Sequence, residues 1–144
     1  MFHKVNNVET LPDYELSVQF AEGITKKYDL KPLFKKWKPF AVLKNNEKLY
    51  ESVKVDQGGF GISWNDELDL SCNELFDNGI VVKTPFDGLI SFGDATLFWE
   101  LNESTLRKAV SYGKFLKGID VCKFGKQWVV SMDAMRREYG ERKK

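Results

Sequence analysis

Four polar side chains within five residues, Ser104, Thr105, Arg107 and Lys108, have the types and the spacing to bind a nucleic acid. Hydroxyls in the first turn of a helix favour a phosphate or a base edge, helped by the backbone amides there. An arginine about one turn further along can donate two hydrogen bonds to guanine in the major groove. A lysine is better suited to a phosphate oxygen. The four residues predict a DNA-reading segment, provided that a helix turns them all outward.

Residues 102–113 have the pattern of such a helix. Leu106, Ala109 and Val110 recur at spacings of three and four residues, which places them on one face. Asn102 is expected to cap the helix through its side-chain oxygen, and Gly113 to end it in the left-handed conformation. A helix this short is not stable alone, so neighbouring elements must cover its apolar face.

The flanking segments predict those neighbours. Ser91 is expected to cap a helix through residues 93–100, and a tight turn then leads into the helix described above. This order is the helix-turn-helix arrangement, in which the first helix braces the second. A closing helix is expected over residues 132–139, with Met132, Met135 and Tyr139 on its apolar face, followed by a frayed tail at residues 141–144.

A hairpin is expected between the second helix and the closing one. Residues 118–123 and 127–130 read as two strands around a short turn that contains Gly125. This hairpin would form a wing, with Lys123 and Lys126 at its tip.

The expected DNA contacts combine the helix, the loop after it and the wing. The residues are Ser104, Thr105, Arg107, Lys108, Lys114, Lys123 and Lys126. Arg107 is expected to contact a base, and the lysines are expected to contact phosphates. For Arg136 and Arg137 two interpretations stay open, a contact with the DNA backbone or an exposed helix face.

Composition and charge agree with this assignment. The chain has 144 residues, of which 42% are hydrophobic and 30% charged, a globular composition. Residues 1–88 hold 11 Lys and Arg against 14 Asp and Glu, and residues 89–144 hold 11 against 7, so the C-terminal part is basic. No apolar run could span a bilayer, and the first residues lack the apolar core of a signal peptide. We expect a cytoplasmic protein without membrane contact.

The residue types argue against catalysis and metal binding. His3 is the only histidine, and two cysteines without a Cys-x-x-Cys pair predict neither a zinc site nor a disulfide framework. The carboxylates Asp66, Glu67 and Asp69 have no nucleophile or histidine partner and are better explained by a polar hairpin turn. We expect no enzymatic activity and no cofactor.

The first half of the chain predicts a small antiparallel α+β module. Alternation of apolar and polar residues is strict over residues 14–20. The expected strands are residues 4–11, 14–20, 24–30, 50–55, 61–64 and 68–70, and the expected helices are 32–37 and 73–77. Residues 80–88, with Pro85 and Gly88, read as a linker. The expected fold class is α+β, with an N-terminal module at residues 1–82 and a winged helix-turn-helix domain at residues 88–144.

Each half resembles a known family. The blocks Tyr28-Asp-Leu30, Val53-Lys-Val-Asp56 and Leu75-Phe-Asp-Asn-Gly79, in this order, resemble the bacterial domain of unknown function 2442. That resemblance implies a domain found alone, beside genes suspected to form toxin–antitoxin pairs, or fused to helix-turn-helix domains. It brings no catalytic residues.

The second resemblance is to DNA-binding domains. Leu101-Asn-Glu-Ser-Thr-Leu-Arg107 with Gly125-Lys-Gln-Trp128 is similar to the excisionase-like and MerR-like winged helices of bacteria and phages. The resemblance implies binding to double-stranded DNA. The long coiled coil through which MerR regulators dimerise is absent.

Two functional hypotheses follow. The first is a sequence-specific DNA-binding protein, an antitoxin-like or small transcriptional regulator whose N-terminal module binds a toxin-like partner or mediates self-association. A homodimer is expected because one winged helix gives a small footprint. The alternative is a protein-interaction adaptor whose helix-turn-helix fold does not read DNA.

Overall fold

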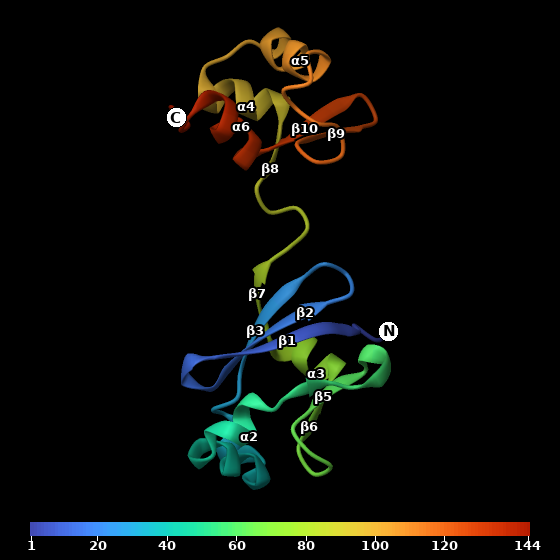
Figure 1. Ribbon diagram of the computed structural model, residues 1–144, viewed down its shortest axis with the longest axis vertical. Helices are drawn as coiled ribbons and strands as arrows, with labels where there is room; N and C mark the ends of the chain where they lie inside the picture. The colour runs from blue at the N-terminus through green and yellow to red at the C-terminus, as the bar shows by residue number, and fades with distance from the viewer. The chain divides into compact units, whose positions relative to one another are not determined.

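The computed structural model describes residues 1–144, which divide into two compact units, residues 1–85 and residues 86–144 (Figure 1). Each unit has its own hydrophobic core. The fold class is α+β, as expected. None of the helices has the length and apolar character needed to span a membrane.

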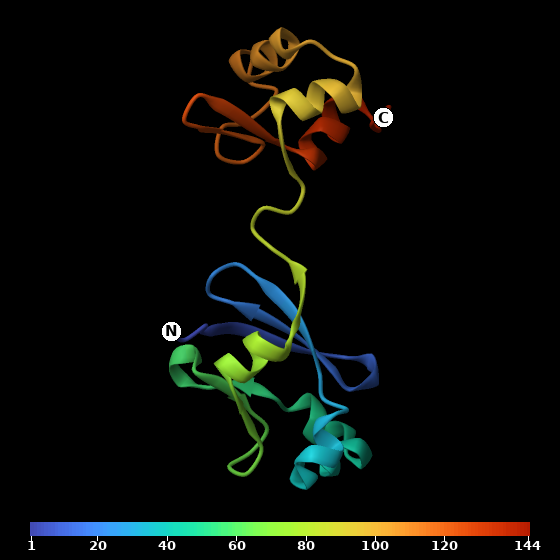
Figure 2. The same ribbon diagram turned by 180° about the vertical axis from the view of Figure 1, so that it is seen from behind.

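A four-stranded antiparallel sheet organises the first unit, in the order β1-β2-β3-β7. Its strands are β1 (Val5–Leu11), β2 (Glu15–Phe20), β3 (Thr25–Asp29) and β7 (Ile80–Lys83). The alternation in β2 is confirmed, because Leu16, Val18 and Phe20 are all buried. Helix α3 (Cys72–Asn78) packs on this sheet, as both ribbon views show (Figures 1 and 2).

A smaller sheet and several short helices complete the core of this unit. The sheet has the order β4-β5-β6. Its strands are β4 (Lys54–Val55), β5 (Gly61–Ser63) and β6 (Asp69–Ser71), and the short helices are α1 (Leu33–Lys36), α2 (Glu47–Glu51) and the 3-10 helices η1 (Pro12–Tyr14), η2 (Lys38–Asn45) and η3 (Gln57–Gly59).

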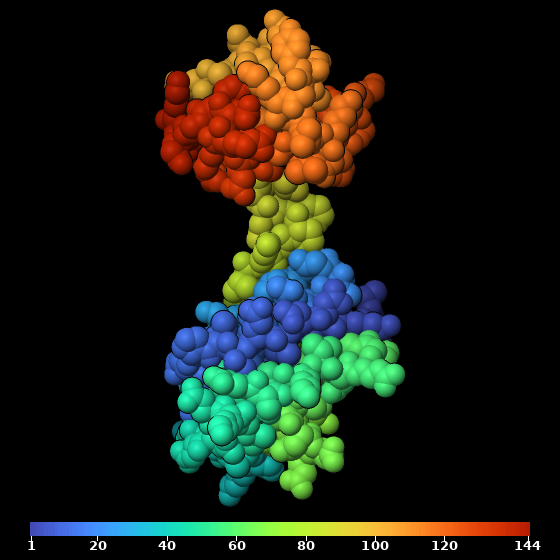
Figure 3. Space-filling view, viewed as in Figure 1, coloured from blue at the N-terminus to red at the C-terminus, as the bar shows by residue number.

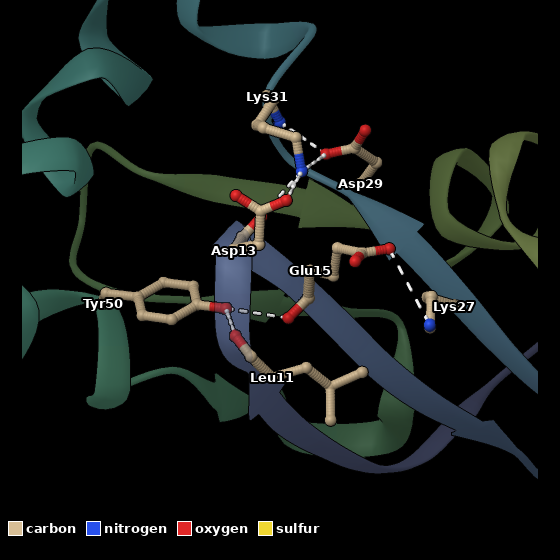
Figure 4. Close-up of polar contacts among 7 residues, drawn as sticks. All are labelled: Leu11, Asp13, Glu15, Lys27, Asp29, Lys31 and Tyr50. Carbon is tan, nitrogen blue, oxygen red and sulfur yellow. Dashed lines mark hydrogen bonds and ion pairs between the residues drawn. The ribbon is translucent and has the colours of Figure 1, made fainter.

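The strand predicted over residues 50–55 is wrong in its first half. Asn46 caps α2 by accepting a hydrogen bond from the Leu49 amide, and this helix includes Tyr50. The buried Tyr50 hydroxyl lies 2.7 Å from the carbonyl oxygens of Leu11 and Glu15, at the turn between β1 and β2 (Figure 4). A local cap and a tertiary contact therefore override the extended pattern of the segment.

The linker predicted over residues 80–88 is also shorter than expected. Residues 80–83 form β7, in which Ile80 lies opposite Lys27 and Val81 opposite Lys26 of β3. The β-branched residues of this segment favour a strand. Strand β7 lies at the edge of the sheet, and its residues Ile80, Val81 and Val82 are exposed. Because both faces of the strand are exposed, it lacks the alternation that reveals half-buried strands.

The second unit combines a three-stranded antiparallel sheet with three helices. The strand order is β8-β10-β9. The strands are β8 (Leu89–Ser91), β9 (Val121–Phe124) and β10 (Gln127–Ser131), and the helices are α4 (Phe92–Trp99), α5 (Glu103–Ser111) and α6 (Met132–Tyr139). The predicted hairpin is confirmed, since Phe124 of β9 lies opposite Gln127 of β10, but its first strand begins at Val121 and not at residue 118. Strand β8 was not predicted.

The helix caps of this unit are only partly as expected. The Ser91 and Ser131 hydroxyls accept hydrogen bonds from the amides of Asp94 and Ala134, which confirms both caps. The predicted side-chain cap at Asn102 is wrong, because its side chain makes no capping bond. The Thr105 amide instead donates to the Asn102 backbone carbonyl.

The tail predicted to fray is bound to α4. The backbone amides of Lys143 and Lys144 both donate to the Phe98 carbonyl, and the Arg142 guanidinium lies 3.9 Å from the centre of the Phe98 ring. The Trp99 indole donates to the Gly140 carbonyl. Carbonyls at the end of α4, which lack partners inside the helix, explain why the tail binds there.

Candidate nucleic-acid interface

Helix α5 separates an apolar face from a polar one. Leu106 and Ala109 are buried in the core of the second unit. Ser104, Arg107 and Lys108 are exposed on the opposite face, as predicted from the helical spacing. Ser111 shares this exposed face but was missed, although it lies one turn after Arg107. The exposed face has the length of two helical turns.

Thr105 lies on the flank of the helix and is only half exposed. It lines a hollow together with Lys108 and Lys114, on the side of α5 that faces the end of α6. The structure therefore brings three of the predicted residues together in a hollow beside the outer face of α5, and Lys108 belongs to both surfaces.

A carboxylate stands within the exposed surface of α5. Glu103 Oε2 lies 3.3 Å from Arg107 Nη2, and both side chains are about half exposed or more. An ion pair this exposed contributes little to stability and exchanges readily with other partners. Glu103 was not identified from the sequence, although its spacing of four residues from Arg107 is typical of helical ion pairs.

The β9–β10 hairpin, which we call the wing, carries the next two predicted residues. Lys126 lies in the two-residue turn, next to Gly125 with its positive φ of 61°. Lys123 lies one cross-strand pair back from the turn, opposite Trp128, and its ammonium is 5.7 Å from the indole ring centre. Lys117, which was not predicted, lies 5.9 Å from the same ring.

The wing approaches the beginnings of both helices of the helix-turn-helix. Trp128 stacks on Phe92, the first residue of α4, with ring centres 5.7 Å apart. A hollow of about 310 Å³ is lined by Gly93, Glu103, Lys126 and their neighbours. The first turn of α4, the first turn of α5 and the wing therefore surround one concave surface.

Arg136 and Arg137 make contacts within the chain. The two terminal nitrogens of Arg137 lie 3.1 and 3.0 Å from the two carboxylate oxygens of Asp120, and Arg136 pairs with Asp133 at 2.8 Å. The hydrogen bonds from Arg137, and then that from the Leu116 amide, hold the pKa of Asp120 below its ordinary value. The same pairing raises the pKa of Arg137. Arg137 thus ties α6 to the loop before β9.

The carboxylates Asp66, Glu67 and Asp69 lie at an exposed turn. The Asn65 side chain accepts hydrogen bonds of 2.9 Å from the amides of Glu67 and Leu68, which closes this turn. No group of three potential ligands gathers where it could hold a metal ion. Both cysteines are free thiols, one in each unit.

Two family models match the chain, one in each half. The model described as "Protein of unknown function (DUF2442)" matches residues 5–81, and the model described as "Helix-turn-helix domain" matches residues 83–144. Neither description names an enzymatic activity, and a helix-turn-helix domain suggests DNA binding. No curated protein and no solved structure matches the chain. The chain therefore belongs to the DUF2442 family of proteins of unknown function, and it carries a helix-turn-helix domain after the family's characteristic region.

Proposed function

We propose that this protein is a sequence-specific DNA-binding protein that reads the major groove with α5 and contacts the DNA backbone with the wing. One observation carries the proposal. The exposed face of α5, with Ser104, Arg107 and Lys108, lies in a unit that matches a helix-turn-helix family. Side chains of these types at the start of a recognition helix are suited to base edges and phosphates.

Of the predicted residues, one would contact a base and the lysines would contact backbone phosphates. Arg107 would contact a base, since its long fork can leave the exposed Glu103 for two acceptors on guanine. Lys126 at the wing turn and Lys123 behind it would bind phosphates on one side of α5. Lys108 and Lys114 would do so on the side of α6.

The biological role that fits this division is a small regulator, antitoxin-like or transcriptional. Residues 89–144 carry the excess positive charge and residues 1–88 a net negative charge, so the net charge favours attraction of the second unit to DNA. The first unit would bind a toxin-like partner or a second copy of the chain. Two copies would enlarge the footprint of a single winged helix.

The test is a gel-shift titration with the full chain, using duplexes enriched from a random-sequence pool. Arg107→Ala should lower affinity for the enriched sequence about 5- to 100-fold, with little change for a scrambled duplex, because one base contact is lost. Lys126→Gln should weaken binding to both duplexes similarly. Arg136→Ala serves as the control, since its guanidinium is paired with Asp133.

The outcomes of this titration separate specific binding from none. Equal loss on both duplexes for Arg107→Ala would leave DNA binding intact but contradict the reading role of α5. A wild-type chain that binds no duplex at low salt would overturn the proposal as a whole.

A protein-interaction adaptor is the second candidate, and one observation favours it. The second unit has a hollow of about 340 Å³ whose lining carries no charged side chain and includes Leu89, Phe124 and Val129. Exposed apolar surface of this kind often marks a protein contact. Retention of a stoichiometric partner that is lost in Phe124→Ser, with no duplex bound by the wild type, would favour this candidate.

A further inference from the structure

A hollow of about 230 Å³ lies between α5 and the end of α6. Six residues line it: Thr105, Lys108, Ala109, Tyr112, Lys114 and Tyr139. In Figure 3 the orange atoms of α5 and of the loop after it border the red atoms of α6 on the face shown. The hollow thus brings together two segments of the second unit that are far apart in sequence, residues 105–114 and the end of α6.

The lining of this hollow is made almost entirely of hydrogen-bond donors. Thr105, Tyr112 and Tyr139 supply hydroxyls, Lys108 and Lys114 supply ammonium groups, and no carboxylate takes part in the lining. None of these five groups makes a hydrogen bond or an ion pair within the chain. Five unpaired donors around one hollow fit a ligand that offers several negatively charged oxygens.

Tyr139 connects the hollow to the core. Its ring packs edge-on against the buried Phe115, with ring centres 6.1 Å apart. Partial burial, and then the nearby Glu138 carboxylate, raise the pKa of Tyr139, so its hydroxyl stays protonated and can donate. Glu138 is itself paired with Arg137 at 3.1 Å, which offsets its charge near the hollow.

We propose that this hollow binds one phosphate group, held by the ammonium groups of Lys108 and Lys114 and by the hydroxyls of Thr105, Tyr112 and Tyr139. The phosphate belongs to the backbone of the duplex that α5 reads, and in this respect the inference rests on the proposed DNA-binding function. Lys108 reaches both surfaces, because it lies on the exposed face of α5 and also lines the hollow. A free phosphate has the same chemistry, so the test distinguishes the two sources.

The variants are chosen to keep the fold. Tyr139→Phe removes one hydroxyl but retains the ring that packs on Phe115. Lys114→Gln removes one charge from an exposed position. Lys143→Gln is the matched control, because it removes the same charge from the tail bound to α4, away from the hollow.

The measurement uses the full chain in two titrations, one with a short duplex of arbitrary sequence at low salt and one with inorganic phosphate. Duplex affinity should fall about 10- to 150-fold in Tyr139→Phe, the range for losing one hydrogen bond to a charged group. Lys114→Gln should lower the slope of log affinity against log salt by about one, and Lys143→Gln should leave it unchanged. Ring resonances of Tyr112 and Tyr139 in NMR spectra report occupancy directly.

The titrations give outcomes that decide between the sources. Tyrosine shifts with the duplex, but not with millimolar phosphate, support a backbone phosphate. Shifts with phosphate alone, lost in Lys114→Gln, support the site but assign it to a free anion. The inference is overturned if Tyr139→Phe and Lys114→Gln bind the duplex with the same affinity as Lys143→Gln, and if neither the duplex nor phosphate shifts the tyrosine resonances.

The same data keep this inference separate from the proposed function. If Arg107→Ala loses sequence preference and the hollow variants behave like the control, DNA reading stands and the phosphate site fails. If phosphate shifts Tyr139 and no duplex binds, the phosphate site stands and the proposed function fails.

Discussion

Three lysines of the first unit and three lysines of the second unit differ in whether other groups of the chain bind their ammonium groups. In the first unit, Lys31 lies within 3.2 Å of Asp13 and 3.0 Å of Asp29, near the pair of Lys27 and Glu15 (Figure 4). Even the buried Lys26 donates to the Phe76 carbonyl.

In the second unit Lys108, Lys114 and Lys126 have no ion-pair partner within the chain. The ammonium groups of these three lysines of the first unit are thus bound within the chain, whereas those of the three lysines of the second unit remain available to a ligand.

The largest expected effect is the loss of stability of the second unit alone when its core is changed. Leu106 is fully buried in the second unit, so Leu106→Ala should destabilise that unit by about 2–5 kcal/mol and abolish duplex binding. Amide signals of the first unit should keep their wild-type positions in NMR spectra. The urea concentration at the midpoint of unfolding of the first unit should also be that of the wild type. The control is Leu97→Ala, at an exposed position of α4. Loss of both sets of signals together would show that the units do not fold independently.

The converse change should affect the first unit alone. Tyr50→Phe removes a buried hydroxyl that lies 2.7 Å from two backbone carbonyls, and should cost about 1–3 kcal/mol of unfolding free energy there. Duplex affinity should be unchanged in a gel-shift titration below the unfolding midpoint. A weaker affinity would indicate that the first unit takes part in DNA binding, and would contradict the assignment of DNA binding to the second unit alone.

The third prediction concerns the ion pair of the second unit whose carboxylate is nearly buried. Arg137→Ala should lower the stability of this unit at neutral pH, since the nearly buried Asp120 carboxylate loses its partner. Because the pKa of Asp120 is lowered from its ordinary value of 3.8, the pair stabilises the fold above that pH and less as pH falls through the lowered pKa. The difference between wild type and variant should therefore shrink below about pH 4.

Urea titrations at a series of pH values check this prediction. Arg136→Ala is the matched control, because its partners Asp133 and Glu141 are highly exposed and should contribute little. A difference between wild type and Arg137→Ala that is the same at every pH would contradict the assigned role of Asp120.

The smallest expected effect is a gain in duplex affinity when a negative charge beside Arg107 is removed. Glu103→Gln removes the one carboxylate paired with Arg107, and should raise duplex affinity at low salt a few-fold, or about 1 kcal/mol. The gain should diminish at higher salt, because the charges are exposed. An unchanged affinity at low salt would show that Arg107 does not approach the DNA backbone or bases.

Much of the fold could be predicted from local patterns, and the errors have physical causes. Strict alternation identified β2, and serine caps identified α3, α4 and α6. Strand β7 was not predicted because an edge strand exposed on both faces shows no alternation of apolar and polar residues. Strand β8 was not predicted because three residues are too few to show such an alternation. Residues 50–55 were misassigned because the Asn46 cap and the contact between Tyr50 and the β1–β2 turn outweigh strand propensity.

The candidate site was predictable only where it lies on one element. Helical spacing was enough to place Ser104, Arg107 and Lys108 on the same face. The pairing of Arg137 with Asp120, 17 residues apart, has no signature in spacing. Tyr139 was taken for an apolar contact, and only the folded chain shows that it lines the same hollow as residues of α5.

The position of Trp128 in the wing has an optical consequence. Its indole, stacked on Phe92, has the ammonium groups of Lys117 and Lys123 within 6 Å of the ring centre. Charges this close to an indole alter the energy of its excited state, and a phosphate that neutralises them would change its emission. The other tryptophan of this unit, Trp99, is shielded in the core. The wing therefore carries an intrinsic fluorophore at the place where the proposed ligand would arrive.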